Sequence, residues 1–300
     1  MKIGYPCINS TLECNGKKTF RLKSYSEQRL IETVDNNLDC LLKILEFNAK
    51  HKIAFFRISS DLVPFASHPV NTYIWQQHFR GKFEEIGDFI KKTGMRISMH
   101  PDQFTLLNSL KEGIFQRSVS ELDYHATILD FMQLDASAKI QIHVGGVYED
   151  KKASMQRFIG RLSRLEDNIR QRLVIENDDK LFNIEDCLQI NEETGVPLLL
   201  DAFHHRINST SATVSQALKL AQRTWDCKKD GVQMVDYSSQ RLDGSKRAHA
   251  ESIDLDDFGS FLEETAPADF DVMLEIKDKE KSAIKAIALA SRDPRFTFVL

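Results

Sequence analysis

LLLDAFHH, residues 198–205, is the stretch from which the rest of the chain is best interpreted. It follows Pro197 with an apolar run of the kind that forms a strand buried on both faces. The run then gives way to Asp201 and two histidines, His204 and His205. Carboxylate and imidazole groups are donors that Zn²⁺ or Mn²⁺ accepts. A hydrogen-bonded loop would explain the same residues, so the interpretation depends on how the other strands end.

The composition is that of an ordinary folded domain. The chain has 300 residues, of which 42% are hydrophobic and 28% are charged, and its net charge is −4. This charge argues against a general nucleic-acid coat but allows a local basic rim around an acidic site. No apolar run reaches the roughly 18 residues of a membrane span, and the first residues show no signal-peptide pattern. The five cysteines form no CxxC pair, and their odd number predicts a reduced, cytoplasmic protein.

Apolar β-rich runs alternate with amphipathic stretches along the whole chain. We expect strands at residues 2–6, 53–59, 95–100, 140–144, 173–177, 197–201, 232–237 and 271–276. We expect helices at residues 30–50, 73–93, 115–134, 152–169, 183–194, 211–224, 255–264 and 279–290. Gly94 and Gly195 follow two of these helices and suit left-handed C-caps.

Strand–helix units repeated in this way predict an α/β fold, a (β/α)8 TIM barrel that forms a single domain over residues 1–300. An open doubly wound sheet is the alternative. It would normally need a glycine-rich turn after the first strand, and residues 5–9, YPCIN, do not form one.

Nearly every expected strand is followed at its carboxyl end by a carboxylate or an imidazole. A TIM barrel carries its active site at this end of its strands. The candidate metal ligands are His68, His100, His143, Glu176, Asp201, His204, Asp236, His249 and Glu275. Each alone could cap a helix or pair with an arginine. Buried together without a cation they would repel one another. We therefore predict a site for two or three divalent ions, bridged by Glu176 or Glu275.

Clustered metal ions suit more than one reaction. They stabilise the attacking and leaving oxygens of an in-line phosphoryl displacement. They also suit sugar isomerisation, in which two ions polarise a carbonyl and a hydroxyl. The ligand set leaves both reactions open.

Several stretches resemble the UV damage endonuclease family, whose barrel is related to those of endonuclease IV and xylose isomerase. The matching stretches are residues 4–9 (GYPCIN), 57–60 (RISS), 100–104 (HPDQF), 143–146 (HVGG), 176–179 (ENDD), and Asp201 with His204 and His205. The resemblance implies a DNA repair enzyme that cuts the strand immediately 5′ of UV photoproducts, both pyrimidine dimers and 6-4 photoproducts. It implies divalent metal cofactors, with Mn²⁺ expected and Zn²⁺ or Mg²⁺ as alternatives.

The resemblance also implies roles for individual residues. The positions that match the family's metal ligands are His68, His100, His143, Glu176, Asp201, His204, His249 and Glu275. Among them we assign Glu176, Glu275, His143 and Asp201 as catalytic. Gln103 and Phe104 match the pair that wedges into the duplex where the damaged dinucleotide is flipped out. Tyr5 and Asn9 match residues that contact the DNA around the lesion.

Two departures from the family pattern matter. Phe104 stands where the family commonly has tyrosine, and its apolar face should still replace lost base stacking. MVD, residues 234–236, stands where the family usually has Lys-x-His, with a lysine that can be carboxylated. Asp236 could replace that histidine as a ligand, but no lysine is present, so the occupancy of a third ion is open.

The expected partner is double-stranded DNA that contains UV lesions, bound by a monomer at the open barrel face, with no membrane. Candidates for phosphate contacts are Lys17, Lys18, Arg21, Lys23, Arg206, Arg241, Lys246 and Arg247. The alternatives are an apurinic-site endonuclease on the same scaffold, a sugar isomerase or epimerase, and a non-catalytic damage binder with a structural metal. The wedge pair and the basic loops argue against the isomerase.

Overall fold

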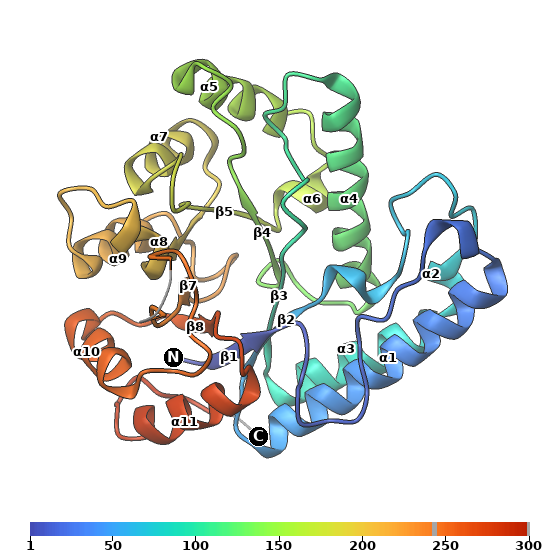
Figure 1. Ribbon diagram of the computed structural model, residues 1–300, viewed down its shortest axis with the longest axis horizontal. Helices are drawn as coiled ribbons and strands as arrows, with labels where there is room; N and C mark the ends of the chain where they lie inside the picture. The colour runs from blue at the N-terminus through green and yellow to red at the C-terminus, as the bar shows by residue number, and fades with distance from the viewer. Residues whose placement is uncertain (242–244, 299–300) are drawn as a thin grey trace.

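A closed barrel of parallel strands forms the centre of the protein (Figure 1). The computed structural model describes residues 1–241 and 245–298. The strands follow one another around the barrel in chain order, and β8 pairs with β1. They are β1 Ile3–Pro6, β2 Phe55–Ile58, β3 Arg96–Met99, β4 Lys139–His143, β5 Leu173–Glu176, β6 Leu198–Asp201, β7 Met234–Tyr237 and β8 Asp271–Leu274. The expected TIM barrel is thus confirmed.

The helices surround the strands on the outside of the barrel (Figure 1). They are α1 Glu27–Lys50, α2 Trp75–His78, α3 Arg80–Thr93, α4 Glu112–Phe131, α5 Lys151–Leu162, α6 Asp167–Arg170, α7 Ile184–Thr194, α8 Ala202–Ile207, α9 Val214–Gln222, α10 Leu255–Thr265 and α11 Glu280–Ala290. Short 3-10 turns lie at Leu22–Ser24 and Ser60–Leu62. Gly94 and Gly195 end α3 and α7 with φ of 61° and 71°, the left-handed C-caps expected for glycine.

Three helical segments differ from the sequence-based expectation. Residues 73–93 form two helices, α2 and α3, because the buried Phe79 leaves the helical conformation between them. Residues 152–169 are likewise divided between α5 and α6. The short helix α8 was not expected, and it forms because Asp201 caps it, with Oδ1 accepting a hydrogen bond from His204 N at 2.7 Å.

The prediction that all five cysteines are reduced was wrong. Cys14 and Cys40 form a disulfide, with their Cα atoms 5.7 Å apart, whereas Cys7, Cys187 and Cys227 are free thiols. The loop after β1 folds back onto α1 and brings these two cysteines together across a sequence separation of 26 residues. No short spacing motif marks such a contact in the sequence. Separately, no helix in the described part of the chain is long and apolar enough to cross a bilayer.

The barrel interior is stacked in layers, because alternate residues of each strand point inward. The middle layer is apolar and contains Phe55, Val174, Leu199, Met234 and Met273. The layer nearest the strand starts is ionic. Its pairs are Lys139 with Asp230 at 2.6 Å and Arg96 with Asp271 at 3.5 Å.

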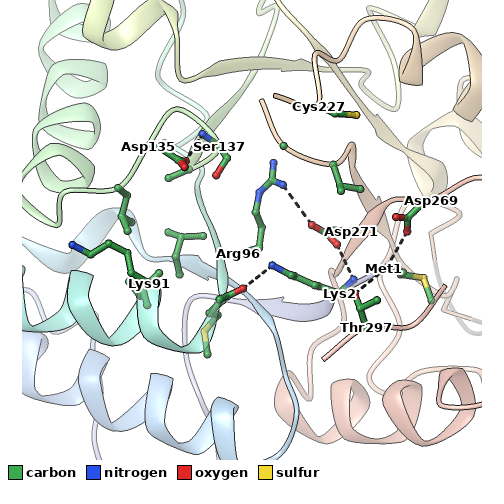
Figure 2. A pocket seen from close by; sticks show the side chains of 18 of the residues that line it. Met1, Lys2, Lys91, Arg96, Asp135, Ser137, Cys227, Asp269, Asp271 and Thr297 are labelled. Carbon is green, nitrogen blue, oxygen red and sulfur yellow. Dashed lines mark hydrogen bonds and ion pairs between the residues drawn. The ribbon is translucent and has the colours of Figure 1, made fainter. Parts of the chain in front are cut away.

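A cavity of about 550 Å³ lies at the closed end of the barrel, which is the end where the strands begin (Figure 2). Arg96 and Asp271 line it together with Lys2, which donates from Nζ to Gly94 O at 2.6 Å. Charges at the N-terminal ends of TIM-barrel strands serve stability, so the chemistry is to be sought at the opposite end.

Candidate metal centre

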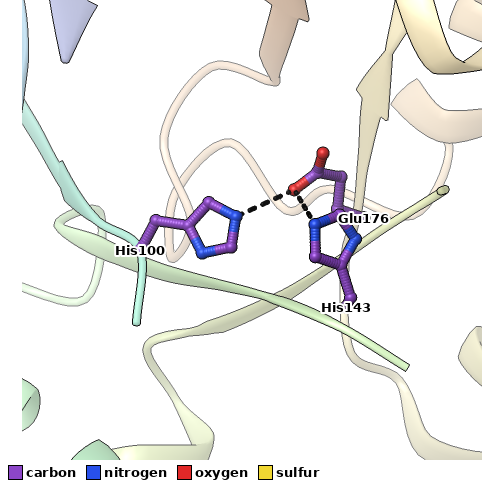
Figure 3. Close-up of side chains that lie close together, drawn as sticks. All are labelled: His100, His143 and Glu176. Atoms are coloured by element: carbon purple, nitrogen blue, oxygen red, sulfur yellow. Dashed lines mark ion pairs between the residues drawn. The ribbon is translucent and has the colours of Figure 1, made fainter. Parts of the chain in front are cut away.

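Glu176 lies at the centre of the site, at the end of β5, with 1% of its surface exposed. Its Oε2 faces His100 and His143, at 3.4 and 3.6 Å from their Nε2 atoms (Figure 3). Its Oε1 faces the other way, toward His204 Nδ1 at 3.3 Å. His204 Nδ1 is also 3.2 Å from Asp201 Oδ2. The two oxygens of one carboxylate therefore belong to two separate groups of donors.

The spacing within both groups fits divalent ions. Ligand atoms that bind one ion at about 2.0–2.2 Å are separated from one another by about 3–3.5 Å. The distances of 3.2–3.6 Å are close to this range. The Nε2 atoms of His100 and His143 both face Glu176 Oε2, so the three atoms are placed to coordinate one ion together. The residues present fit a pair of metal ions.

The charges of the site are strongly coupled. Burial alone would raise the pKa of Glu176, but His143, His100 and His204 lower that pKa well below its usual range. Burial and the nearby Glu176, Glu275 and Asp236 raise the pKa of Asp201 well above its usual range, against the opposing effect of His204. A bound cation would reduce the electrostatic repulsion between carboxylates that lie this close together.

A third group of possible ligands joins Asp201, Asp236 and Glu275. Arg57, on β2, lies among them. Its Nη2 donates to Asp236 Oδ1 and Oδ2 at 2.8 and 2.7 Å, and its Nη1 pairs with Glu275 Oε1. Burial raises the pKa of Asp236 to about 7 despite Arg57. For Glu275, Arg57 overcomes the effect of burial and lowers the pKa to about 2.

Gln141 connects this third group to Glu176. Its Nε2 donates to Glu176 Oε2 at 2.5 Å and to Asp236 Oδ2 at 2.6 Å, while its Oε1 accepts from Arg57 Nη2 at 2.8 Å. Neither Arg57 nor Gln141 is among the residues that the sequence predicts for the site. The available signal was a polar residue inside an apolar strand, in FFRI of β2 and KIQIH of β4.

Two predicted ligands lie outside these three groups. His68 is exposed in the loop after β2, and its Nδ1 accepts from Val70 N at 3.0 Å. His249 is half-buried, and its Nδ1 donates to Glu275 O at 2.8 Å. That bond leaves Nε2 of His249 available and sets the orientation of the ring. Both ligand roles stay predictions.

The predicted DNA-contacting residues fall into two pairs. Gln103 and Phe104 are exposed at the barrel mouth, and Phe104 has 72% of its surface accessible. Tyr5 and Asn9 are buried instead. Asn9 Nδ2 donates to Tyr5 Oη at 2.9 Å, and Tyr5 Oη donates to Asn48 Oδ1 of α1 at 2.7 Å. The structure therefore brings the first pair to the site entrance and places Tyr5 between the barrel and α1.

A closed barrel that gathers carboxylates and imidazoles at the carboxyl ends of its strands defines a TIM-barrel protein with a candidate metal centre. The family model described as UV-endonuclease UvdE matches residues 1–294. A UV DNA damage endonuclease of Clostridium perfringens is 39% identical over 288 residues, which cover 96% of this chain and 70% of that relative. The chain belongs to the UV-endonuclease UvdE family, which confirms the expected family and enzyme class.

Solved structures agree with this assignment. The crystal structure of SacUVDE matches with a TM-score of 0.94 and 43% identity, covering 99% of this chain and 100% of that one. Endonuclease IV from Thermus thermophilus matches with a TM-score of 0.56 and 13% identity, covering 84% of this chain and 93% of that one. The second likeness shows a shared fold alone.

Proposed function

We propose that this protein is a metal-dependent endonuclease that cuts DNA immediately 5′ of UV photoproducts. The observation that carries the proposal is Glu176, whose two carboxylate oxygens face two separate donor groups. A carboxylate placed in this way would be able to hold two ions, and paired ions suit phosphodiester hydrolysis. The family membership of the chain supplies the class of substrate.

The residues that would hold the ions are His100 and His143 in one group, His204 and Asp201 in the other, and Glu176 between them. Mn²⁺ is the metal we expect for this mixture of imidazole and carboxylate donors, with Zn²⁺ as the alternative. Bound divalent ions supply an acidified water and polarise the scissile phosphate. The chain holds these donors on different strand ends and loops, so the barrel itself sets their relative positions.

Lesion recognition is assigned to Gln103 and Phe104. Gln103 lines a cavity of about 150 Å³ together with His100 and His143, next to the first donor group. An exposed aromatic ring at this entrance can take the place of the bases that leave the stack. A crosslinked dinucleotide stacks poorly and costs less to flip than normal bases, so damage is selected by deformability.

Lys279 is a candidate for contact with the DNA backbone that the sequence did not suggest. It is half-buried at the N-terminus of α11, and its charge interacts with Glu275, Cys7 and Lys17. Burial lowers the pKa of Lys279. By contrast, Arg206 pairs with Asp257 at 3.0 Å, so this predicted phosphate contact already has a carboxylate partner.

We expect the protein to act as a monomer in the cytoplasm. The open barrel face must admit a duplex, and a second copy covering that face would prevent this. Sedimentation of the protein alone and with a lesion-containing duplex tests the expected monomer. A dimer that persists on DNA would contradict it.

The cut position can be tested with an end-labelled duplex that carries one cyclobutane dimer. The proposal predicts a single product that ends at the phosphodiester immediately 5′ of the dimer, with a 3′-hydroxyl, and no product in EDTA. The same duplex with an abasic site in place of the dimer is the control. Cleavage confined to the abasic duplex would support the apurinic-site endonuclease instead.

A further inference from the structure

We propose that the guanidinium of Arg57 occupies the place of a third metal ion, so that the centre binds two divalent ions. The inference rests on the proposed metal-dependent function and specifies its ion count. It assigns Asp236 as the counter-ion of Arg57 rather than as a metal ligand.

The contacts of Arg57 show that it fills the third donor group. Asp201, Asp236 and Glu275 each offer an oxygen within 4.8 Å of the others. Arg57 is 3% exposed and reaches two of them, donating from Nη2 to both oxygens of Asp236 and pairing through Nη1 with Glu275 Oε1. A planar guanidinium with several donors is suited to a cluster of carboxylates.

Asp236 has little capacity left for an ion. Its Oδ1 accepts from Arg57, and its Oδ2 accepts from both Arg57 and Gln141. It is fully buried, so its remaining lone pairs have no contact with water. A dication beside the guanidinium would also be repelled by it, most strongly in a buried site. Entry of a third ion therefore requires Arg57 to leave.

The neighbouring position on β7 offers no replacement ligand. Met234 precedes Asp236 by two residues, so its side chain points inward one layer deeper in the barrel. It is fully buried in the apolar cluster that includes Phe55 and Met273. A ligand from this position would have to be introduced into the apolar middle layer. Both inward positions of β7 are thus committed to other contacts.

The two remaining groups keep their donors. Asp201 uses Oδ1 to cap α8 and presents Oδ2 to His204 at 3.2 Å. Glu176 presents one oxygen to each group. Gln141 joins Glu176 to the pair formed by Arg57 and Asp236, through its Nε2 and Oε1 atoms. Two divalent ions and one guanidinium carry five positive charges, which more than balance the four carboxylates of the centre.

The ion count tests this inference directly. The purified protein is loaded with Mn²⁺, freed of excess by gel filtration and analysed by inductively coupled plasma mass spectrometry. We expect two ions per chain. Asp236→Asn keeps a hydrogen-bond acceptor for Arg57 and is expected to keep two ions, whereas Asp201→Asn is expected to bind fewer than two.

Two variants of Arg57 separate charge from shape. Arg57→Lys retains a cation and is expected to retain two ions. Arg57→Met has a similar length without charge, and titration with Mn²⁺ is expected to reveal a third ion. If Arg57→Met fails to fold, the wild-type and Asp236→Asn counts decide alone.

Three ions in the wild-type protein, reduced to two by Asp236→Asn, would overturn the inference. That result would leave the proposed nuclease intact if Mn²⁺-dependent nicking were retained. No bound ion together with no nicking would instead contradict the proposed function itself. The two failures are therefore distinguishable in one set of preparations.

Discussion

A single buried carboxylate, Glu176, organises the site at the scale of residues. Its charge is maintained in a fully buried position because three imidazoles surround it and lower its pKa. Replacing the charge of Glu176 while keeping its shape should therefore weaken metal binding in both donor groups at once.

We predict that Glu176→Gln abolishes tight Mn²⁺ binding and lowers nicking of irradiated DNA by more than about 100-fold, since even residues behind a ligand contribute about 10- to 100-fold. Glu185→Gln, at an exposed position in the first turn of α7, is the matched control and should behave as the wild type. Metal content and nicking rate are the measurements. A Glu176→Gln protein with normal metal content would contradict the assignment of Glu176 as a ligand shared by the two donor groups.

The wedge pair should separate lesion recognition from metal binding. Gln103→Ala with Phe104→Ala removes exposed side chains, so the melting temperature and Mn²⁺ content should not change. Stacking of a base on an aromatic ring contributes about 1–3 kcal/mol, which predicts a loss of lesion-specific nicking of about 10- to 100-fold. Leu289→Ala changes another exposed apolar side chain, 37% accessible and in the last turn of α11, and serves as the control. Undiminished nicking would remove the wedge assignment.

His125 provides a pH-dependent signature in the core. Burial lowers the pKa of His125 to about 4 from 6.5, and its Nδ1 donates to Glu121 O at 2.7 Å. Between these values the unfolded chain binds a proton that the folded protein does not, so the free energy of unfolding decreases as the pH falls from 6.5 toward 4.

We predict that His125→Phe removes this pH dependence. The difference in unfolding free energy between wild type and variant should change by about 2 kcal/mol on acidification from neutral to about pH 5. Denaturant titrations in EDTA measure it without a contribution from bound metal. Parallel pH profiles for the two proteins would show that His125 titrates normally in the folded state.

At the scale of elements, the strand ends were predictable and the interior of the barrel was only partly so. Apolar runs marked each strand, and the polar residue that followed it marked the open end of the barrel. Arg57 belongs to a stretch that matches the family, but neither it nor Gln141 is predicted as a site residue, because each lies inside an apolar strand. The inward face becomes evident only when alternate residues are compared across neighbouring strands.

The same limitation affected Tyr5 and α8. Tyr5 lies near the end of an apolar strand, and its sequence position does not reveal that the hydroxyl group donates to Asn48 on α1. The short helix α8 depends on one cap by Asp201, a contact that also fixes where His204 lies. Tertiary contacts of this kind outweigh local propensity, and the local sequence pattern does not reveal them.

The ionic layer at the closed end should contribute stability without affecting chemistry. Lys139 is fully buried and pairs with the buried Asp230 at 2.6 Å. Lys139→Met leaves that carboxylate unpaired, which should cost about 3–5 kcal/mol of stability. Arg80→Met breaks the exposed pair with Glu84 and should cost less than about 1 kcal/mol. Melting temperature and Mn²⁺ content are measured together. A loss of bound metal in a folded Lys139→Met protein would contradict this division of roles.

At the scale of the whole molecule, one closed barrel does two separate tasks. Its N-terminal end and middle layer hold the strands together through ion pairs and apolar packing. Its carboxyl end collects donors that would repel one another without cations. The disulfide between Cys14 and Cys40 joins the first loop to α1 and was not predictable, because it depends on a long-range contact.

Nicking of supercoiled plasmid tests the central claim most directly. Irradiated, undamaged and depurinated plasmids are incubated with the protein and Mn²⁺, and in parallel with EDTA. We predict rapid Mn²⁺-dependent nicking of the irradiated plasmid, little nicking of the undamaged one, and none of either in EDTA. Equal nicking of irradiated and undamaged plasmid, or no nicking by protein that demonstrably holds metal, would contradict the account.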